Sequence, residues 1–105
     1  EVLRTLAREM QARLRLSDVL ARWGGEEFVI MLSDTRAPLA RGGVERVREA
    51  VLGLRFQFDT GPQAVTVSAG LAEHLAGESV AQTLERADRA LYEAKAQGRN
   101  RVVVA

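Results

Sequence analysis

Apolar positions along the chain follow two patterns, and segments of the two kinds alternate. Apolar residues three or four positions apart, as on one face of a helix, occupy three segments: Val2–Leu14, Pro38–Leu54 and Val80–Ala94. Short apolar runs typical of strands occupy five more: Val19–Trp23, Phe28–Leu32, Arg55–Phe58, Ala64–Ala72 and Arg101–Val104. This order predicts an α/β (α+β) sandwich, with a mostly antiparallel central sheet flanked by helices.

Local signals set the ends of the second and third helices. Ser79 followed by Gln82 forms a capping box, which satisfies backbone N–H groups at the start of the third helix. Gly98 comes just past its last turn and suits a helix stop. Gly42 and Gly43 weaken the second helix, since each costs about 1 kcal/mol relative to alanine. We expect that helix either to use both glycines for close packing or to begin after them.

The first helical pattern has no capping residue before it, because the chain begins inside the pattern. We therefore expect these 105 residues to be the C-terminal part of something longer. The length suits one compact domain rather than two.

Composition and charge exclude several classes of function. The 15 basic and 14 acidic residues nearly cancel and only 5% of residues are aromatic, which disfavours a nucleic-acid groove. The absence of cysteine excludes disulfides, zinc–thiolate sites and thiol catalysis. His74 is the single histidine, which excludes a His-rich metal site. No apolar run reaches membrane-spanning length.

Only the letters GGEE separate the first two predicted strands. Gly24 and Gly25 suit a two-residue hairpin turn of type I′, which needs a positive φ at both positions. Glu26 and Glu27 follow, and adjacent side chains on a strand face opposite ways, so the two acids need not share one role. On the hairpin alone, solvated acids at a turn are the favoured interpretation of both residues.

Four ordered segments resemble the GGDEF domain of diguanylate cyclases: RLSD (15–18), RWGGEEF (22–28), VTVSAGLA (65–72) and ADRALYEAKAQGRNRV (87–102). The resemblance covers essentially the whole chain. The family's D-x-L-T-G-L-x-N-R segment, its first strand with a metal-binding aspartate and its guanine-holding helices are not among these residues. The resemblance therefore implies that residues 1–105 are a single partial GGDEF domain with a nucleotide-cyclase palm-like fold that lacks its first strand and helices.

The resemblance implies a reaction that joins two GTP molecules into cyclic di-GMP and releases pyrophosphate, with Mg²⁺ (or Mn²⁺) as cofactor. Such transfer depends on positioning and on neutralising phosphate charge. Glu27 would bind metal, and Glu26 would assist deprotonation of the 3′-hydroxyl or hold a second metal ion. Gly24 and Gly25 would lie against the substrate, because glycine leaves the backbone open to close approach.

Five further residues receive roles from the resemblance: Lys95, Arg99, Arg15, Asp18 and Arg46. Lys95 and Arg99, four apart near a helix end, would share a face and bind the terminal phosphates of GTP; offsetting the helix dipole is the alternative. Arg15 and Asp18 match the family's inhibitory RxxD site for cyclic di-GMP, and Arg46 would support that ligand. Each of these three residues has an alternative interpretation. Arg15 can be a helix-end cation, Asp18 a turn residue and Arg46 a solvated helix arginine.

Two functions compete. An active cyclase would work as a homodimer with one GTP in each half-site, whereas a catalytically silent receptor would bind cyclic di-GMP through Arg15 and Asp18. The undegraded GGEEF favours the cyclase, although we expect the isolated 105 residues to be inactive. The resemblance also implies a cytoplasmic domain of a parent that a membrane anchor can tether, with an upstream sensor or receiver domain. Four residues are expected in or near the core: Trp23, Phe28, Leu91 and Tyr92.

Overall fold

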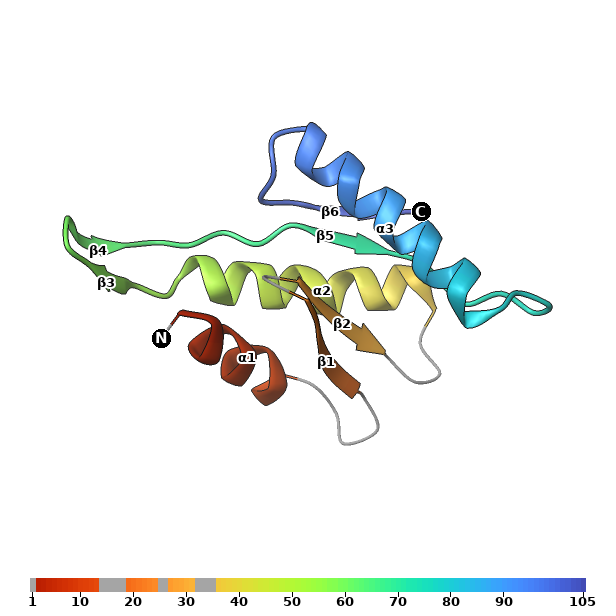
Figure 1. Cartoon of the computed structure of the whole chain (residues 1–105), viewed down its shortest axis with the longest axis horizontal. Helices are drawn as coiled ribbons and strands as arrows, with labels where there is room; N and C mark the ends of the chain where they lie inside the picture. The colour runs from red at the N-terminus through yellow and green to blue at the C-terminus, as the bar shows by residue number, and fades with distance from the viewer. Residues whose placement is uncertain (1, 14–18, 25–26, 32–35) are drawn as a thin grey trace. The chain divides into compact units, whose positions relative to one another are not determined.

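The structure, a computed structural model, describes residues 2–13, 19–24, 27–31 and 36–105, with the backbone alone at 2–3, 19–24 and 27–31. The chain divides into two compact units, residues 1–35 and 36–105 (Figure 1). We call them the N-terminal unit and the C-terminal unit and describe each by itself.

The N-terminal unit begins with helix α1 (Val2–Ala12). Leu6 and Met10, one helical turn apart, are both buried, as the apolar spacing predicts. Arg13 forms a solvent-exposed ion pair with Glu9, one turn earlier, at 2.6 Å. The first helical pattern is therefore confirmed from Val2 to Ala12.

Strands β1 (Val19–Gly24) and β2 (Glu27–Met31) form an antiparallel hairpin in this unit. Val19 pairs with Met31 and Gly24 pairs with Glu27, with an irregularity in the register between Arg22 and Gly24. The predicted hairpin is confirmed, but Gly24 is the last residue of β1 rather than a turn residue. The two residues between the paired ends are 25 and 26, which lie outside the described residues.

The C-terminal unit begins with helix α2 (Ala37–Leu52), with a proline in its first turn. Both glycines of the second helical pattern lie inside this helix, so the alternative of a later start is wrong. Ala40, Val47 and Val51 are its buried residues and lie on one face. Leu39, by contrast, is 76% exposed.

A short hairpin follows α2. Strands β3 (Phe56–Phe58) and β4 (Gly61–Gln63) pair antiparallel, with Phe58 opposite Gly61. Figure 1 shows this hairpin beyond the C-terminal end of α2. The strand predicted at Ala64–Ala72 is shorter than expected, because only β5 (Ala69–Leu71) pairs with another strand.

The rest of the unit is a strand–helix–strand crossover. Helix α3 (Val80–Ala96) connects β5 to β6 (Val102–Val104), and the two strands pair in parallel, with Ala69 opposite Val102. Parallel neighbours require such a crossover connection. Both α2 and α3 pack against the β5–β6 pair. Seven buried residues make the core here: Ala40, Val47, Val51, Phe56, Ala90, Ala94 and Val102.

The mixed helix-and-strand fold is confirmed. Within the described residues the strands form three two-stranded sheets, of which β1–β2 and β3–β4 are antiparallel and β5–β6 is parallel. One expected core residue is wrong: Tyr92 is 77% exposed, because it lies on the side of α3 that faces away from the strands. No described helix is long and apolar enough to cross a bilayer.

Candidate functional site

The β1–β2 hairpin, which carries the GGEEF letters and is called the signature hairpin below, places two of its residues in a defined backbone register. Gly24 ends β1 and Glu27 begins β2, and the two are ladder partners. A glycine opposite Glu27 leaves that position of the ladder without a Cβ, so a ligand can approach the backbone beside the carboxylate-bearing residue. Gly25 and Glu26 lie outside the described residues, as do Arg15 and Asp18.

The C-terminal end of α3 carries the predicted phosphate-binding pair. Lys95 lies in the last turn and is half-buried, while Arg99 is exposed and lies beyond Gln97, the C-cap. The expected shared helical face is therefore wrong, since the helix ends at Ala96. The chain folds back instead, so both residues remain at the same end of α3.

A Schellman motif produces this fold-back. The Arg99 N–H donates to the Ala94 carbonyl at 2.9 Å, and the Gly98 N–H donates to the Lys95 carbonyl at 3.3 Å. Gly98 has φ 118°, as the predicted glycine stop requires. Arg99 and Asn100 follow with φ 65° and 49°, the left-handed region that residues other than glycine seldom adopt.

Asn100 is held by contacts from two other parts of the unit. Its backbone N–H donates to the Ser68 hydroxyl at 3.0 Å, and its Oδ1 accepts from the Arg48 guanidinium of α2 at 2.7 Å. Glu45 of the same helix pairs with Arg48. Sequence analysis missed these contacts because the partners are distant along the chain, although Ser68 and Asn100 both belong to the motif segments.

Arg46 lies exposed on α2, as expected. Its guanidinium passes over the two helical glycines: Nη1 is 3.7 Å from the position that a Cβ on Gly42 would occupy, and Nη2 is 3.8 Å from that on Gly43. The glycines therefore give the arginine room to lie along the helix. Its place relative to Arg15 and Asp18 lies outside what the structure describes.

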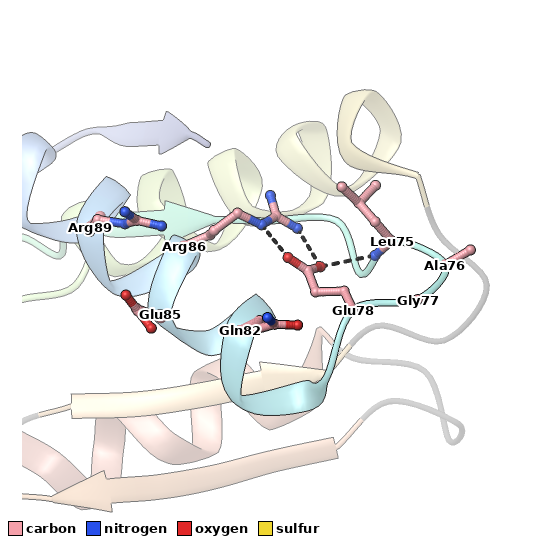
Figure 2. A pocket seen from close by; sticks show the side chains of 8 residues that line it. All are labelled: Leu75, Ala76, Gly77, Glu78, Gln82, Glu85, Arg86 and Arg89. Atoms are coloured by element: carbon pink, nitrogen blue, oxygen red, sulfur yellow. Dashed lines mark hydrogen bonds and ion pairs between the residues drawn. The ribbon is translucent and has the colours of Figure 1, made fainter.

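A separate shallow hollow lies at the other end of α3 (Figure 2). Its lining residues are Leu75, Ala76, Gly77, Glu78, Gln82, Glu85, Arg86 and Arg89. Arg86 Nε and Nη2 donate to the two carboxylate oxygens of Glu78, at 2.6 and 2.7 Å. None of the predicted site residues that the structure describes lines this hollow.

The Glu78 carboxylate ties the loop before α3 to the helix. The hydrogen bonds from Arg86 lower its pKa to about 2 against the opposing effect of burial, and those from the Leu75 N–H and the Thr83 hydroxyl act in the same direction. The hydrogen bonds that Arg86 donates to Glu78 raise the pKa of Arg86 in turn. Arg86 also donates to the Glu73 carbonyl. The hollow is therefore walled by a structural ion pair.

The donor chemistry of the signature hairpin fits a hard divalent cation. Mg²⁺ in nucleotide sites is commonly held by one or two carboxylates, with phosphate oxygens and water as the other ligands. Glu26 and Glu27 supply two such carboxylates. Elsewhere, within the described residues, no three acidic, histidine or cysteine side chains lie together as a metal site would require.

Several curated proteins match this chain over all or nearly all of its length. Diguanylate cyclase DgcP of Pseudomonas aeruginosa is 43% identical over 105 residues, which cover 100% of this chain and 16% of the relative. Diguanylate cyclase A of Treponema denticola is 40% identical over 104 residues, which cover 98% of this chain and 28% of the relative. The chain therefore spans less than a third of the length of these relatives.

Solved structures share the fold. Diguanylate cyclase SiaD of Pseudomonas aeruginosa, in complex with its activator SiaC, matches with a TM-score of 0.93 and 45% identity, over 99% of this chain and 40% of that one. The GGDEF domain of DgcB from Caulobacter crescentus, in complex with c-di-GMP, matches with a TM-score of 0.92 and 35% identity, over 98% and 62%. The family model for the diguanylate cyclase GGDEF domain matches residues 1–101. With this match over nearly its whole length, the chain belongs to the GGDEF domain family.

Proposed function

We propose that this chain is part of a diguanylate cyclase domain that makes cyclic di-GMP from two GTP molecules. The observation that carries the proposal is the register of the signature hairpin, in which Gly24 pairs with Glu27 within the family's GGEEF loop. Curated relatives named diguanylate cyclase support the same activity.

In the proposed reaction, the 3′-hydroxyl oxygen of each GTP forms a bond to the α-phosphorus of the other. The bond from that phosphorus to the bridging oxygen of the β-phosphate breaks, and pyrophosphate leaves. Glu26 accepts the hydroxyl proton or holds a second metal ion, and Glu27 is a metal ligand. Bound Mg²⁺ (or Mn²⁺) neutralises charge on the phosphate oxygens.

Each half-site holds one GTP, so closing the ring requires two copies of the domain facing each other. Lys95 and Arg99 bind the terminal phosphates. The support for this role is their common position at the end of α3, where Arg99 is exposed and its backbone bonds to the last turn of the helix. A guanidinium suits phosphate because its fixed fork of N–H donors matches the oxygens.

The test is synthesis of cyclic di-GMP from GTP and Mg²⁺ by the full-length protein that carries this chain. Glu27→Ala should lower the rate at least about 100-fold, since losing a metal ligand costs no less than losing a residue that supports one. The thermal unfolding midpoint should change little. Unchanged synthesis in Glu27→Ala would sink the proposal. A wild-type protein that binds cyclic di-GMP without making it would favour the silent receptor instead.

Product inhibition is the second part of the proposal. Arg15 and Asp18 bind cyclic di-GMP, with Arg46 as a supporting cation; the GGDEF domain of DgcB, a structural relative, was solved in complex with c-di-GMP. An arginine can bind guanine O6 and N7 through two hydrogen bonds. In a titration of cyclic di-GMP, Arg15→Ala should weaken binding roughly 10-fold or more and relieve inhibition. Equal affinity in wild type and variant would exclude this site.

A further inference from the structure

Arg99 has a backbone conformation that its own side chain does not favour. Its φ of 65° is left-handed, and it lies between Gly98 at 118° and Asn100 at 49°. Glycine adopts such angles freely and asparagine with some ease, but arginine does so only where its surroundings hold it there. The conformation of Arg99 therefore depends on what fixes its two neighbours.

On the preceding side, helix α3 fixes the chain. The Schellman hydrogen bonds to Ala94 and Lys95 tie Gly98 and Arg99 to the last turn. The Arg99 carbonyl also accepts from the Arg101 Nε at 3.0 Å. These contacts hold the N–H and the carbonyl of Arg99, but none of them holds the side chain of Asn100.

On the following side, Asn100 is fixed from two directions. The hydroxyl of Ser68, just before β5, accepts a hydrogen bond from the Asn100 N–H at 3.0 Å. The Arg48 guanidinium of α2 donates to Asn100 Oδ1 at 2.7 Å. The link from Arg48 to Asn100 joins α2 to the turn after α3 through one hydrogen bond. Rotation of Asn100 would break both contacts at once.

Arg48 itself is not exposed enough for a direct role in binding a nucleotide. Its side chain is 17% exposed, and its charge is paired with Glu45. Arg99, by contrast, is exposed. The two arginines at this corner therefore differ in function: one is held inside the unit, and the other is directed outward.

We propose that Arg48 and Asn100 are positioning residues, which hold Arg99 in the left-handed conformation needed to reach the terminal phosphates of GTP. The inference rests on the phosphate-binding role proposed above for Arg99. It adds that this role depends on α2, through the contact between the Arg48 guanidinium and Asn100 Oδ1. The loss of that contact lets the exposed guanidinium sample other directions, so phosphate affinity falls while the rest of the nucleotide site is unaffected.

The test compares two ligands by calorimetry, with Mg²⁺, in the full-length protein that carries this chain. The first is a GTP analogue with a methylene α–β bridge, and the second is GMP, which lacks the terminal phosphates. Asn100→Gly removes Oδ1 and still permits a positive φ, whereas Asn100→Asp keeps an acceptor oxygen for Arg48. Arg48→Ala removes the donor. Arg41→Ala, an exposed arginine of α2, is the matched control.

Asn100→Gly and Arg48→Ala should weaken binding of the analogue roughly 10- to 150-fold, the range expected for one hydrogen bond to a charged group. Their affinity for GMP should stay at the wild-type value. Asn100→Asp and Arg41→Ala should bind both ligands as wild type does. Two results would overturn the inference: an equal loss of affinity for the analogue and for GMP, or an unchanged affinity of Asn100→Gly for the analogue.

Arg99→Ala separates failure of this inference from failure of the phosphate-binding role. If Arg99→Ala leaves the affinity for the analogue unchanged, Arg99 binds no phosphate and both proposals fall. If Arg99→Ala weakens binding of the analogue while Asn100→Gly and Arg48→Ala do not, only the positioning inference is wrong.

Discussion

The β1–β2 hairpin pairs residues that are neighbours in sequence, whereas the β5–α3–β6 crossover pairs strands on either side of a whole helix. In the hairpin, the motif letters supply one acidic residue, Glu27, at the start of a two-stranded ladder. In the crossover, several motif letters supply geometry instead: Ser68, Gly70, Gly98 and Asn100. The family motifs thus combine residues to which we assign the chemistry with residues that shape the backbone.

Gly70 provides the strongest test of that division. A Cβ at this position would lie 2.1 Å from the Ala87 carbonyl oxygen and 2.2 Å from the Leu91 nitrogen, both backbone atoms of α3. No side-chain rotation can relieve such a clash. Gly70→Ala should therefore lower the free energy of unfolding by about 3 kcal/mol or more, at the upper end of overpacking costs.

The measurement is chemical denaturation of wild type and variant. Gly42→Ala is the matched control, since its Cβ would meet only the Arg46 side chain at 3.7 Å, within a helix. That variant should gain up to about 1 kcal/mol from helix propensity. A Gly70→Ala protein as stable as wild type would show that β5 and α3 do not pack as closely as described.

Gly98 should have the next largest effect. Its φ of 118° strains any L-residue, while the described atom nearest to its Cβ position is at the movable end of the Arg101 side chain, 3.1 Å away. Gly98→Ala should cost about 1–2 kcal/mol of unfolding free energy from the backbone alone. In the full-length protein it should also reduce affinity for GTP, because Arg99 follows directly.

Gly77→Ala serves as the control for this variant. Gly77 also has a positive φ, at 80°, and no atom of the described residues lies within 4 Å of its Cβ position. A comparable loss in thermal stability is expected, with no change in GTP affinity. If both variants affect nucleotide binding equally, the end of α3 has no special relation to the substrate.

The pair of Glu78 and Arg86 should have the smallest effect, and one that depends on pH. The folded pKa of Glu78, about 2, lies below its ordinary value of 4.5. Between these values the unfolded state binds more protons, so stability rises with pH in that window. Thermal melts should show wild type more stable than Glu78→Gln at neutral pH, with the difference shrinking as the pH falls from about 4.5 toward 2.

Arg86→Gln provides the partner control for that measurement. The double variant should be little less stable than either single variant, since one ion pair is lost in every case. A stability difference between wild type and Glu78→Gln that stays constant down to pH 3 would contradict the assigned pKa.

Sequence patterns predicted local structure well. The spacing of apolar residues placed the helices, Ser79 and Gln82 form the expected capping box, and Gly98 ends α3. Each of these features depends on residues a few positions apart. The GGEEF letters likewise predicted a hairpin, although Gly24 continues the β1 ladder instead of belonging to the turn.

Long-range features were not predictable in the same way. The parallel pairing of β5 with β6 depends on the crossover through α3, and the exposed face of Tyr92 depends on how that helix packs. The Arg48–Asn100 hydrogen bond joins residues 52 positions apart and leaves no periodic trace. For the predicted site, the structure places Arg99 beyond the helix end, which its spacing from Lys95 did not predict.

The parallel pairing of β5 with β6 also has a consequence for biosynthesis. A two-residue connection lets the β1–β2 ladder close as soon as both strands have left the ribosome. Among the described strands, the partner of β5 is β6, so this pairing must wait until all of α3 and then β6 have been synthesised. During that interval, the edges of β5 have no hydrogen-bond partner in β6. The nascent chain therefore acquires its signature loop early and the strand pair on which its last helix packs late.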